Sequence, residues 1–357
     1  YAWSTMNIIR SHSEGTYINR IESNMISYDF LDHTRFQYAI WTQDNTIIRN
    51  NSIDGDHMDR AIYAQNNCLI DSNTITGEFN QQGLIYVAGD TVSVYNNTIN
   101  QTGSGASIYS SGNNAISIFD NEFNLTNSAR WISVDNTEAD VHHNLVTLNN
   151  GRGVEFYNQS AGSIYNNSII STGIGDYGIF LTNQTAVPIY NNIIQGFQNG
   201  IYAENTIQNY NLDHNNLWNI EGSLFSGSAI PPLAGQMIDQ NANGDASDIY
   251  ANISFDPQFV DASNDDYDLL ITSPCINAGT DNLNDPDGTV SDIGANYHFI
   301  YIVINHTPLQ STIDTNGPYW VEPVIVSTIQ APIDVSLNYS TDGGENYTSV
   351  VMPYTSN

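Results

Sequence analysis

An asparagine returns at intervals of 22 to 27 residues through the first two thirds of the chain. Each copy occupies the same place in an apolar-x-x-Asn-x-apolar pattern. The nine copies are Asn24, Asn51, Asn73, Asn97, Asn121, Asn144, Asn167, Asn192 and Asn215. Chance does not produce nine such registers in a row. The spacing therefore predicts a structural unit of about 24 residues that is repeated along residues 1–222.

The positions around this asparagine are equally regular. The residue three places before it is Ile21, Ile48, Ile70, Val94, Ile118, Val141, Ile164, Ile189 or Leu212. The residue two places after it is Ile26, Ile53, Ile75, Ile99, Phe123, Val146, Ile169, Ile194 or Leu217. Large apolar residues with polar residues between them predict a strand, a tight turn and a second strand. A third short strand lies about ten residues upstream, as in "GLIYVA" at 83–88, so each repeat holds three strands and no helix.

A chain that returns to the same face after each repeat forms a coil stacked on itself. Neighbouring coils pair in parallel at about 4.8 Å, so nine coils make a rod of roughly 40 Å. The recurring asparagine is expected at a corner that needs a residue tolerant of the left-handed conformation. Its side-chain amide can donate to one neighbouring copy and accept from the other, which predicts a ladder of hydrogen bonds along the rod.

Leucine-rich repeats share this period and also carry an asparagine after an apolar position. Their other half needs a Leu-rich convex segment, whereas here it holds Gly, Ser, Thr and β-branched residues. The repeats instead resemble the right-handed parallel β-helix family, the pectate-lyase-like superfold. This resemblance implies an all-β fold with three short strands per coil, and it carries little information on function.

Two further segments follow the repeats. Residues 223–300, with "FDPQFVDASNDDYDLL" and "SPCINAG", resemble the irregular final coils and C-terminal cap of secreted bacterial β-helix proteins. In this cap "DPDG" predicts a turn, and Asp285, Asp287 and Asp292 are candidate calcium ligands, although their spacing departs from the usual calcium loop. Residues 301–357 alternate apolar and polar residues around "TDGGEN" at 341–346 and resemble a truncated immunoglobulin-like β-sandwich.

The formal net charge is −31, with seven Arg and no Lys. Such a charge repels nucleic acid and anionic lipid, and no apolar stretch has the length of a membrane span, so neither nucleic acid binding nor membrane insertion is expected. We expect an extracellular or cell-surface protein that requires no cofactor, with calcium as an option on the acidic surface. Cys68 and Cys275 are expected to be buried free thiols. The first residues already match the interior of a repeat, which predicts further domains or other subunits as partners.

Outward-facing side chains supply the candidate binding site. The middle residue of each upstream strand points outward if its neighbours fill the core. This column carries six aromatic residues, Trp41, Tyr63, Tyr86, Tyr109, Phe180 and Tyr202, and is interrupted by Ser133 and Glu155. Aromatic faces stack on sugar rings, which suits a carbohydrate; the alternative is that the rings stack on one another. A second column is interpreted as structural and contains Glu22, Arg49, Asp71, Tyr95, Phe119, His142, Tyr165, Tyr190 and Asp213.

The interruption of the first column is the candidate catalytic site. Arg130 and Arg152 stand three residues before it, and together with Glu155 and His142 they could serve an enzyme. Lyases of the similar family use Arg or Lys as a base, and the hydrolases use close Asp residues with a Gly-His-Gly loop. This chain has no Lys and no such Asp arrangement.

The sequence therefore favours a secreted or cell-surface module that is non-catalytic. Its role is predicted to be binding or adhesion to an extracellular polysaccharide or cell-surface glycan, or that of a structural spacer. Two alternatives remain. One is a polysaccharide lyase or glycoside hydrolase acting on an extracellular polysaccharide, and the other is a structural subunit of an extracellular assembly.

Overall fold

A computed structural model of the chain describes residues 7–11, 18–28, 38–55, 59–79, 83–127, 129–182, 187–204, 211–298, 302–305, 324–327, 335–339, 346 and 348–352. The chain divides into two compact units, residues 1–298 and 299–357.

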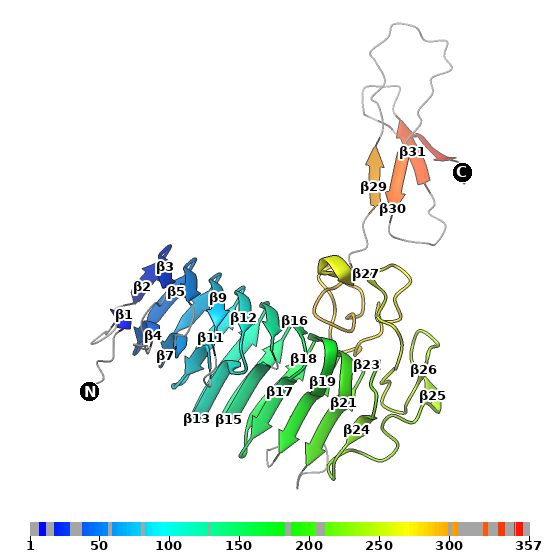
Figure 1. Ribbon diagram of the computed structural model, residues 1–357. Helices are drawn as coiled ribbons and strands as arrows, with labels where there is room; N and C mark the ends of the chain where they lie inside the picture. Colours follow the sequence, from blue (N-terminus) through cyan, green and yellow to red (C-terminus); the bar gives the residue numbers. More distant parts are fainter. Residues whose placement is uncertain are drawn as a thin grey trace, which may run out of the picture. The chain divides into compact units, whose positions relative to one another are not determined.

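The first unit is built on a 24-stranded parallel sheet wound into coils, and Figure 1 shows its strands side by side along the rod. Each coil passes through three faces, numbered here in chain order. Face 1 contains β1 (Asn7–Ser11), β4 (Tyr38–Thr42), β7 (Arg60–Ala64), β10 (Ile85–Val87), β17 (Arg152–Tyr157) and β24 (Ser223–Ser226). Face 2 contains β2 (Asn19–Glu22), β5 (Thr46–Arg49), β8 (Leu69–Asp71), β11 (Val92–Tyr95), β18 (Ala161–Tyr165), β20 (Ile189–Tyr190) and β22 (Leu212–Asp213).

Face 3 follows the recurring asparagine and contains β3 (Met25–Tyr28), β6 (Ser52–Gly55), β9 (Thr74–Glu78), β12 (Thr98–Thr102), β14 (Glu122–Thr126), β16 (Leu145–Leu148) and β23 (Asn216–Trp218). Four longer strands turn a corner. β13 (Ala106–Phe119) and β15 (Arg130–His142) pass from face 1 to face 2, and β19 (Ser168–Thr182) and β21 (Ile193–Glu204) pass from face 3 to face 1. The predicted all-β fold, a parallel β-helix, is confirmed.

The core lies inside the coils, where inward residues of face 1, such as Ile40, Ile62 and Ile85, meet the two apolar columns that flank the asparagine. All eighteen of their side chains are buried, with exposed fractions from 0% to 6%. They belong to a single hydrophobic cluster that runs along the rod. Burial of each such side chain stabilises the fold by roughly 1.5 to 3 kcal/mol relative to leaving it in water.

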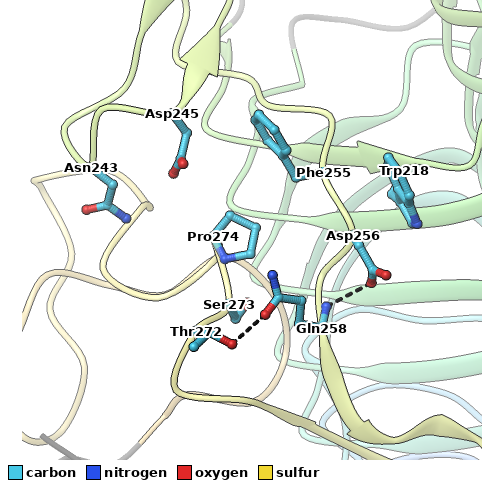
Figure 2. A pocket seen from close by; sticks show the side chains of 9 residues that line it. All are labelled: Trp218, Asn243, Asp245, Phe255, Asp256, Gln258, Thr272, Ser273 and Pro274. Carbon is cyan, nitrogen blue, oxygen red and sulfur yellow. Dashed lines mark hydrogen bonds between the residues drawn. The ribbon is translucent and has the colours of Figure 1, made fainter. Parts of the chain in front are cut away.

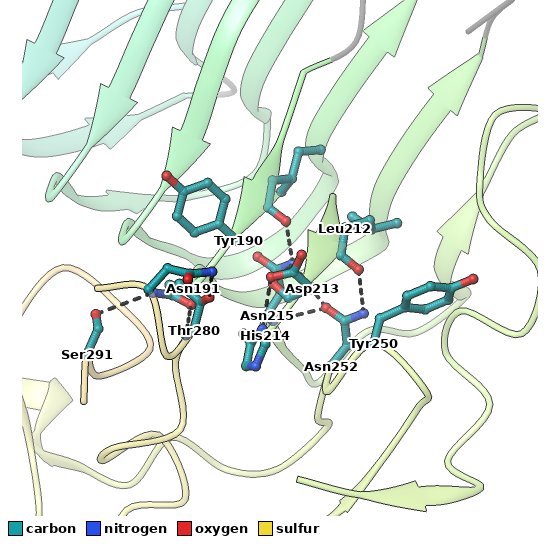
Figure 3. Close-up of polar contacts among 12 residues, drawn as sticks. Tyr190, Asn191, Leu212, Asp213, His214, Asn215, Tyr250, Asn252, Thr280 and Ser291 are labelled. Carbon is teal, nitrogen blue, oxygen red and sulfur yellow. Dashed lines mark hydrogen bonds and ion pairs between the residues drawn. The ribbon is translucent and has the colours of Figure 1, made fainter. Parts of the chain in front are cut away.

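The nine asparagines form the predicted ladder. The Nδ2 of each donates to the Oδ1 of the next at 2.9 to 3.0 Å, and the backbone N–H of each donates to the same Oδ1 at 2.9 to 3.1 Å. A tenth member, Asn252, accepts from Asn215 at 3.0 Å, and both side chains are drawn in Figure 3. The sequence pattern missed Asn252 because 37 residues separate it from Asn215.

The left-handed corner was assigned to the wrong residue. The residue immediately before each ladder asparagine has φ between 48° and 58°, and the ten residues are Ser23, Asn50, Ser72, Asn96, Asp120, His143, Asn166, Asn191, His214 and Ala251. The ladder asparagine follows this corner and directs its amide along the rod instead. The Asn-Asn doublets therefore combine two roles, because the first Asn makes the turn and the second makes the ladder.

The cap folds back along the last coils. It contains the antiparallel pairs β25 (Asp239–Gln240) with β26 (Ala246–Ser247) and β27 (Phe259–Asp261) with β28 (Asp266–Leu269), and a 3-10 helix at Ala262–Asn264. Turn residues of the rod hold it, since Asn166 Nδ2 donates to the carbonyl of Asp292 at 3.0 Å. Asn191 Oδ1 accepts from the N–H of Thr280 at 2.9 Å, as Figure 3 shows.

Both cysteines are buried free thiols, as predicted; Cys275 lies in a small second core with Ile193, Ile253 and Ile293. The second unit contains two antiparallel pairs, β29 (Ile302–Asn305) with β30 (Val324–Ser327) and β31 (Val335–Tyr339) with β32 (Thr348–Met352). Most of the predicted turn at 341–346 lies outside the described residues, and the immunoglobulin-like assignment stays a prediction. In the described part of the chain, no helix has the length and apolarity needed to cross a membrane.

Candidate functional site

The first outward column is aligned on face 1. Its members pair coil by coil in the strand register, in the order Trp41, Tyr63, Tyr86, Tyr109, Ser133, Glu155, Phe180 and Tyr202. The aromatic side chains are half-buried, whereas Ser133 and Glu155 are only 4% and 0% exposed. The interruption is therefore the most buried part of the column.

The rings of this column stack on one another. The Trp41 and Tyr63 rings are 5.9 Å apart and 9° from parallel, and the Tyr63 and Tyr86 rings are 5.4 Å apart and 4° from parallel. Beyond the interruption, the Phe180 and Tyr202 rings are 4.9 Å apart at 12°. In these parallel pairs each ring covers a face of the next, so the pairs offer ring edges to the outside, whereas the Tyr86 and Tyr109 rings are 5.4 Å apart and tilted by 41°. A sugar stacks on a ring face, and this geometry favours the alternative that the column stabilises the sheet.

Three of the four candidate catalytic residues meet at the interruption. Arg152 Nη1 lies 2.8 Å from Glu155 Oε1, and Arg130 Nε lies 3.6 Å from Glu155 Oε2. Arg152 also reaches Asp176 Oδ2 at 3.3 Å, and its guanidinium lies 5.5 Å from the centre of the Phe180 ring. The two guanidinium groups thus neutralise a carboxylate that fills the place of a ring in the column.

This arrangement limits the chemistry of Glu155. A general acid or base must come within hydrogen-bonding distance of the proton that it transfers. The Glu155 side chain is 0% exposed and is covered by the two arginines, so a substrate at the surface cannot contact it. Burial, with the neighbouring Glu155 carboxylate, also raises the pKa of Tyr157 to about 12, so the Tyr157 hydroxyl stays protonated at neutral pH.

His142, the fourth candidate, belongs to a different group. It lies in the second column, on face 2, between the rings of Phe119 at 5.1 Å and Tyr165 at 4.8 Å. Its Nδ1 is 2.9 Å from the Nδ1 of His143. Burial and the nearby His143 lower the pKa of His142 to about 4, so the imidazole is neutral at neutral pH. The sequence placed His142 one sheet away from Glu155, and β15 turns a corner between Arg130 and His142, so that the two residues lie on different faces.

The second column is a stack of five aromatic side chains, Tyr95, Phe119, His142, Tyr165 and Tyr190, with ring centres 4.8 to 5.1 Å apart. Its ends are charged, with an ion pair between Arg49 and Asp71 at one end and Asp213 beside His214 at the other. A cavity of about 450 Å³ separates the middle of this stack from the cap, and Asp285 and Tyr297 line it opposite His142. The sequence could not place this cavity, because folding of the cap creates it.

The predicted calcium site is not assembled. Asp285 and Asp292 are buried side by side, but Asp292 directs its carboxylate to the backbone N–H groups of Asn277 and His298 at 2.7 and 2.6 Å. Asp287 is exposed and accepts from Thr289 within the turn. Burial and the charge of Asp292 raise the pKa of Asp285 to about 7. In the ranges that the structure describes, no three His, Cys, Asp or Glu side chains are grouped to hold a metal ion.

Comparison with known protein families identifies the family of the rod. Residues 4–228 match the family model described as "Periplasmic copper-binding protein (NosD)". The match covers more than half of the chain, including every coil of the parallel sheet, and ends before β25, the first strand of the cap. No curated protein matches the chain.

Proposed function

The chain belongs to the NosD family, and from this membership and the geometry of the rod we propose that it is a rigid, non-catalytic β-helix module of the cell envelope or the extracellular space. The proposal depends on one observation, the burial and ion pairing of the Glu155 side chain. This carboxylate stands at the interruption of the outer column, yet it is fully buried and paired with two guanidinium groups. It completes the column instead of facing a substrate.

The rod has the features of a stiff spacer. The ladder of amide hydrogen bonds is continuous from Asn24 to Asn252, and two stacks of aromatic side chains run along its outer faces. Each coil is stabilised by the coils on both sides of it, so bending the rod would break hydrogen bonds and ring contacts together. Such a body holds whatever is attached to its ends at a fixed separation.

Copper is named in the description of the family, and the described residues do not fit a copper ion. Copper prefers imidazole and sulfur ligands. The two adjacent imidazoles, His142 and His143, share a hydrogen bond between their Nδ1 atoms, and no third ligand joins them among the described residues. Both thiols are buried in the core, and burial raises the pKa of Cys275 to about 12, which disfavours the thiolate that binds metal.

The proposal is tested by looking for turnover. The full chain is incubated with neutral, amino-sugar and uronate polysaccharides, and unsaturated products and reducing ends are measured. We expect neither product to exceed the blank, for the wild type and for Glu155→Gln alike. Products from the wild type that disappear in Glu155→Gln would instead establish the lyase or hydrolase alternative.

A further inference from the structure

A second cavity, of about 440 Å³, lies where the last coil meets the cap (Figure 2). Its walls come from four segments. Trp218 ends β23 on face 3, Phe255 and Asp256 follow the last ladder asparagine, and Thr272 to Pro274 belong to a later loop of the cap. Asn243, Asp245 and Gln258 complete the lining. The cavity thus combines two aromatic side chains with carboxylate and amide groups.

The aromatic walls differ from the two stacked columns. Trp218 pairs in the strand register with Gln195, which pairs with Ile170. The neighbour of Trp218 on the preceding coil is therefore an amide side chain, and no ring from that coil covers the indole. Phe255 is 36% exposed, an unusual state for a large apolar side chain. Ring faces that neighbouring rings leave open are the surfaces on which a sugar can stack.

The walls of the cavity are held by one buried side chain and by two contacts at its exposed rim. Asn216, which is 0% exposed, accepts from the N–H of Phe255 at 3.1 Å and donates to its carbonyl at 2.9 Å. One oxygen of Asp256 accepts from the N–H of Gln258 at 2.9 Å, and the Thr272 hydroxyl donates to the Gln258 side chain. Figure 2 shows both contacts. Binding to walls that are already fixed costs little ordering entropy.

The charge of the cavity selects its ligand. Two carboxylates, Asp245 and Asp256, line it, and the chain contains no Lys or Arg after Arg152. A carboxylate offers about four acceptor positions, and the backbone N–H of Gln258 uses one of those on Asp256. Acceptors suit hydroxyl or ammonium donors, whereas two negative charges without a nearby cation repel an acidic ligand.

We propose that this cavity binds a sugar unit that carries no negative charge, either a neutral sugar or an amino sugar within a glycan. The sugar ring lies against Trp218 and Phe255, and its hydroxyl or amino groups donate to Asp245 and Asp256. This goes beyond the proposed function, because a rigid module needs no ligand site. It also assigns the glycan contact to the end of the rod instead of the stacked aromatic column on face 1.

The full chain is tested on an array of neutral, amino-sugar and uronate-containing oligosaccharides, and the best ligand is titrated by calorimetry. We expect binding to non-acidic oligosaccharides and none to the uronates. Trp218→Ala should weaken binding about tenfold or more, which corresponds to loss of one aromatic stacking contact. Trp218→Phe should weaken it less, and Asp256→Asn several-fold. Tyr63→Ala, which removes a stacked ring of the face 1 column, is the matched control and should bind as the wild type does.

Three results would overturn the proposal. The first is that no non-acidic oligosaccharide binds the wild type. The second is a preference for uronates. The third is a pattern of affinities that does not follow the cavity: unchanged binding in the folded Trp218→Ala and Asp256→Asn variants, with or without loss of binding in Tyr63→Ala. Asp256 is exposed, so its substitution leaves the fold intact, and thermal unfolding of each variant separates a binding defect from misfolding. Turnover of polysaccharide would refute the proposed function and leave this binding site untouched.

Discussion

Asn144 lies in the middle of the ladder, and its replacement by alanine is the sharpest test of the fold. The side chain is 0% exposed and makes five hydrogen bonds. The two hydrogens of its Nδ2 are shared among three acceptors at 2.9 Å, Asn167 Oδ1 and the carbonyls of Ile118 and His142. Its Oδ1 accepts from the side chain and the backbone N–H of Asn121 at 2.9 and 3.1 Å.

Truncation leaves several of these groups without a partner. The backbone N–H of Asn121 loses its acceptor, and two carbonyls lose a donor inside a region that water does not reach. One unsatisfied buried group costs about 1 to 3 kcal/mol, and each net hydrogen bond contributes about 1 kcal/mol. We therefore expect Asn144→Ala to lower the free energy of unfolding by about 3 to 5 kcal/mol.

Asn24→Ala is the matched control at the end of the ladder. Asn24 is half-buried and its side chain donates to Asn51 Oδ1 at 2.9 Å and to the carbonyl of Glu22 at 3.2 Å. Its backbone N–H still reaches Asn51 after truncation. We expect this variant to lower the free energy of unfolding by about 1 kcal/mol. Both variants are unfolded in urea and followed by circular dichroism, and the free energies of the first unfolding transition are compared. Equal losses, or a loss below about 1 kcal/mol for Asn144→Ala, would refute the reasoning.

Three further predictions concern pH and the corners. Unfolded His142 takes up a proton near pH 6.5 but the folded protein only near 4, so this group opposes folding as the pH falls. Urea unfolding at pH 7.5 and 5 should show the wild type losing stability relative to His142→Phe, by about 1 kcal/mol after allowance for solvent screening. The pKa of Asp285 is raised from 3.8 to about 7, so the contribution of Asp285 to stability falls as the pH rises through 7. The melting temperature of Asp285→Asn should therefore rise relative to that of the wild type between pH 5 and pH 8. A relative fall would contradict this expectation. Asn96 has φ 54°, so Asn96→Gly should change the melting temperature little, whereas Asn96→Val should lower stability by about 1 to 2 kcal/mol.

The coils, the core and the ladder could be predicted because each is a local rule repeated many times. Ile48, Ile70 and Val94 occupy equivalent places, so one period fixes where all of them lie. A residue that departs from the period cannot be predicted in this way. Asn252 joins the ladder because the long segment after Asn215 returns to the corner at which the ladder lies. No regular interval in the sequence predicts this return. The left-handed residue was misplaced by one position because adjacent asparagines satisfy both requirements equally well in sequence.

The candidate site shows a second limit. A repeat predicts which side chains are neighbours, but it does not predict how they are oriented or how deeply they are covered. Tyr63 and Trp218 are both aromatic residues at outward positions, yet Tyr63 is sandwiched between the rings of Trp41 and Tyr86. Glu155 is also at an outward position and is fully buried, because Arg130 and Arg152 cover it.

Regular coils therefore use their outer side chains to hold one another, and each repeated position is satisfied by its copies above and below. A ligand needs groups that are not satisfied in this way. Such groups arise where the repetition ends, because the last copy has another copy on one side only. Trp218 lies in the last regular coil, where its neighbour on one side is Gln195 and the segment after Asn252 lies on the other side. That segment and the cap place Phe255, Asp245 and Asp256 around the same cavity. The end of the rod, more than its length, is where recognition by this protein is expected.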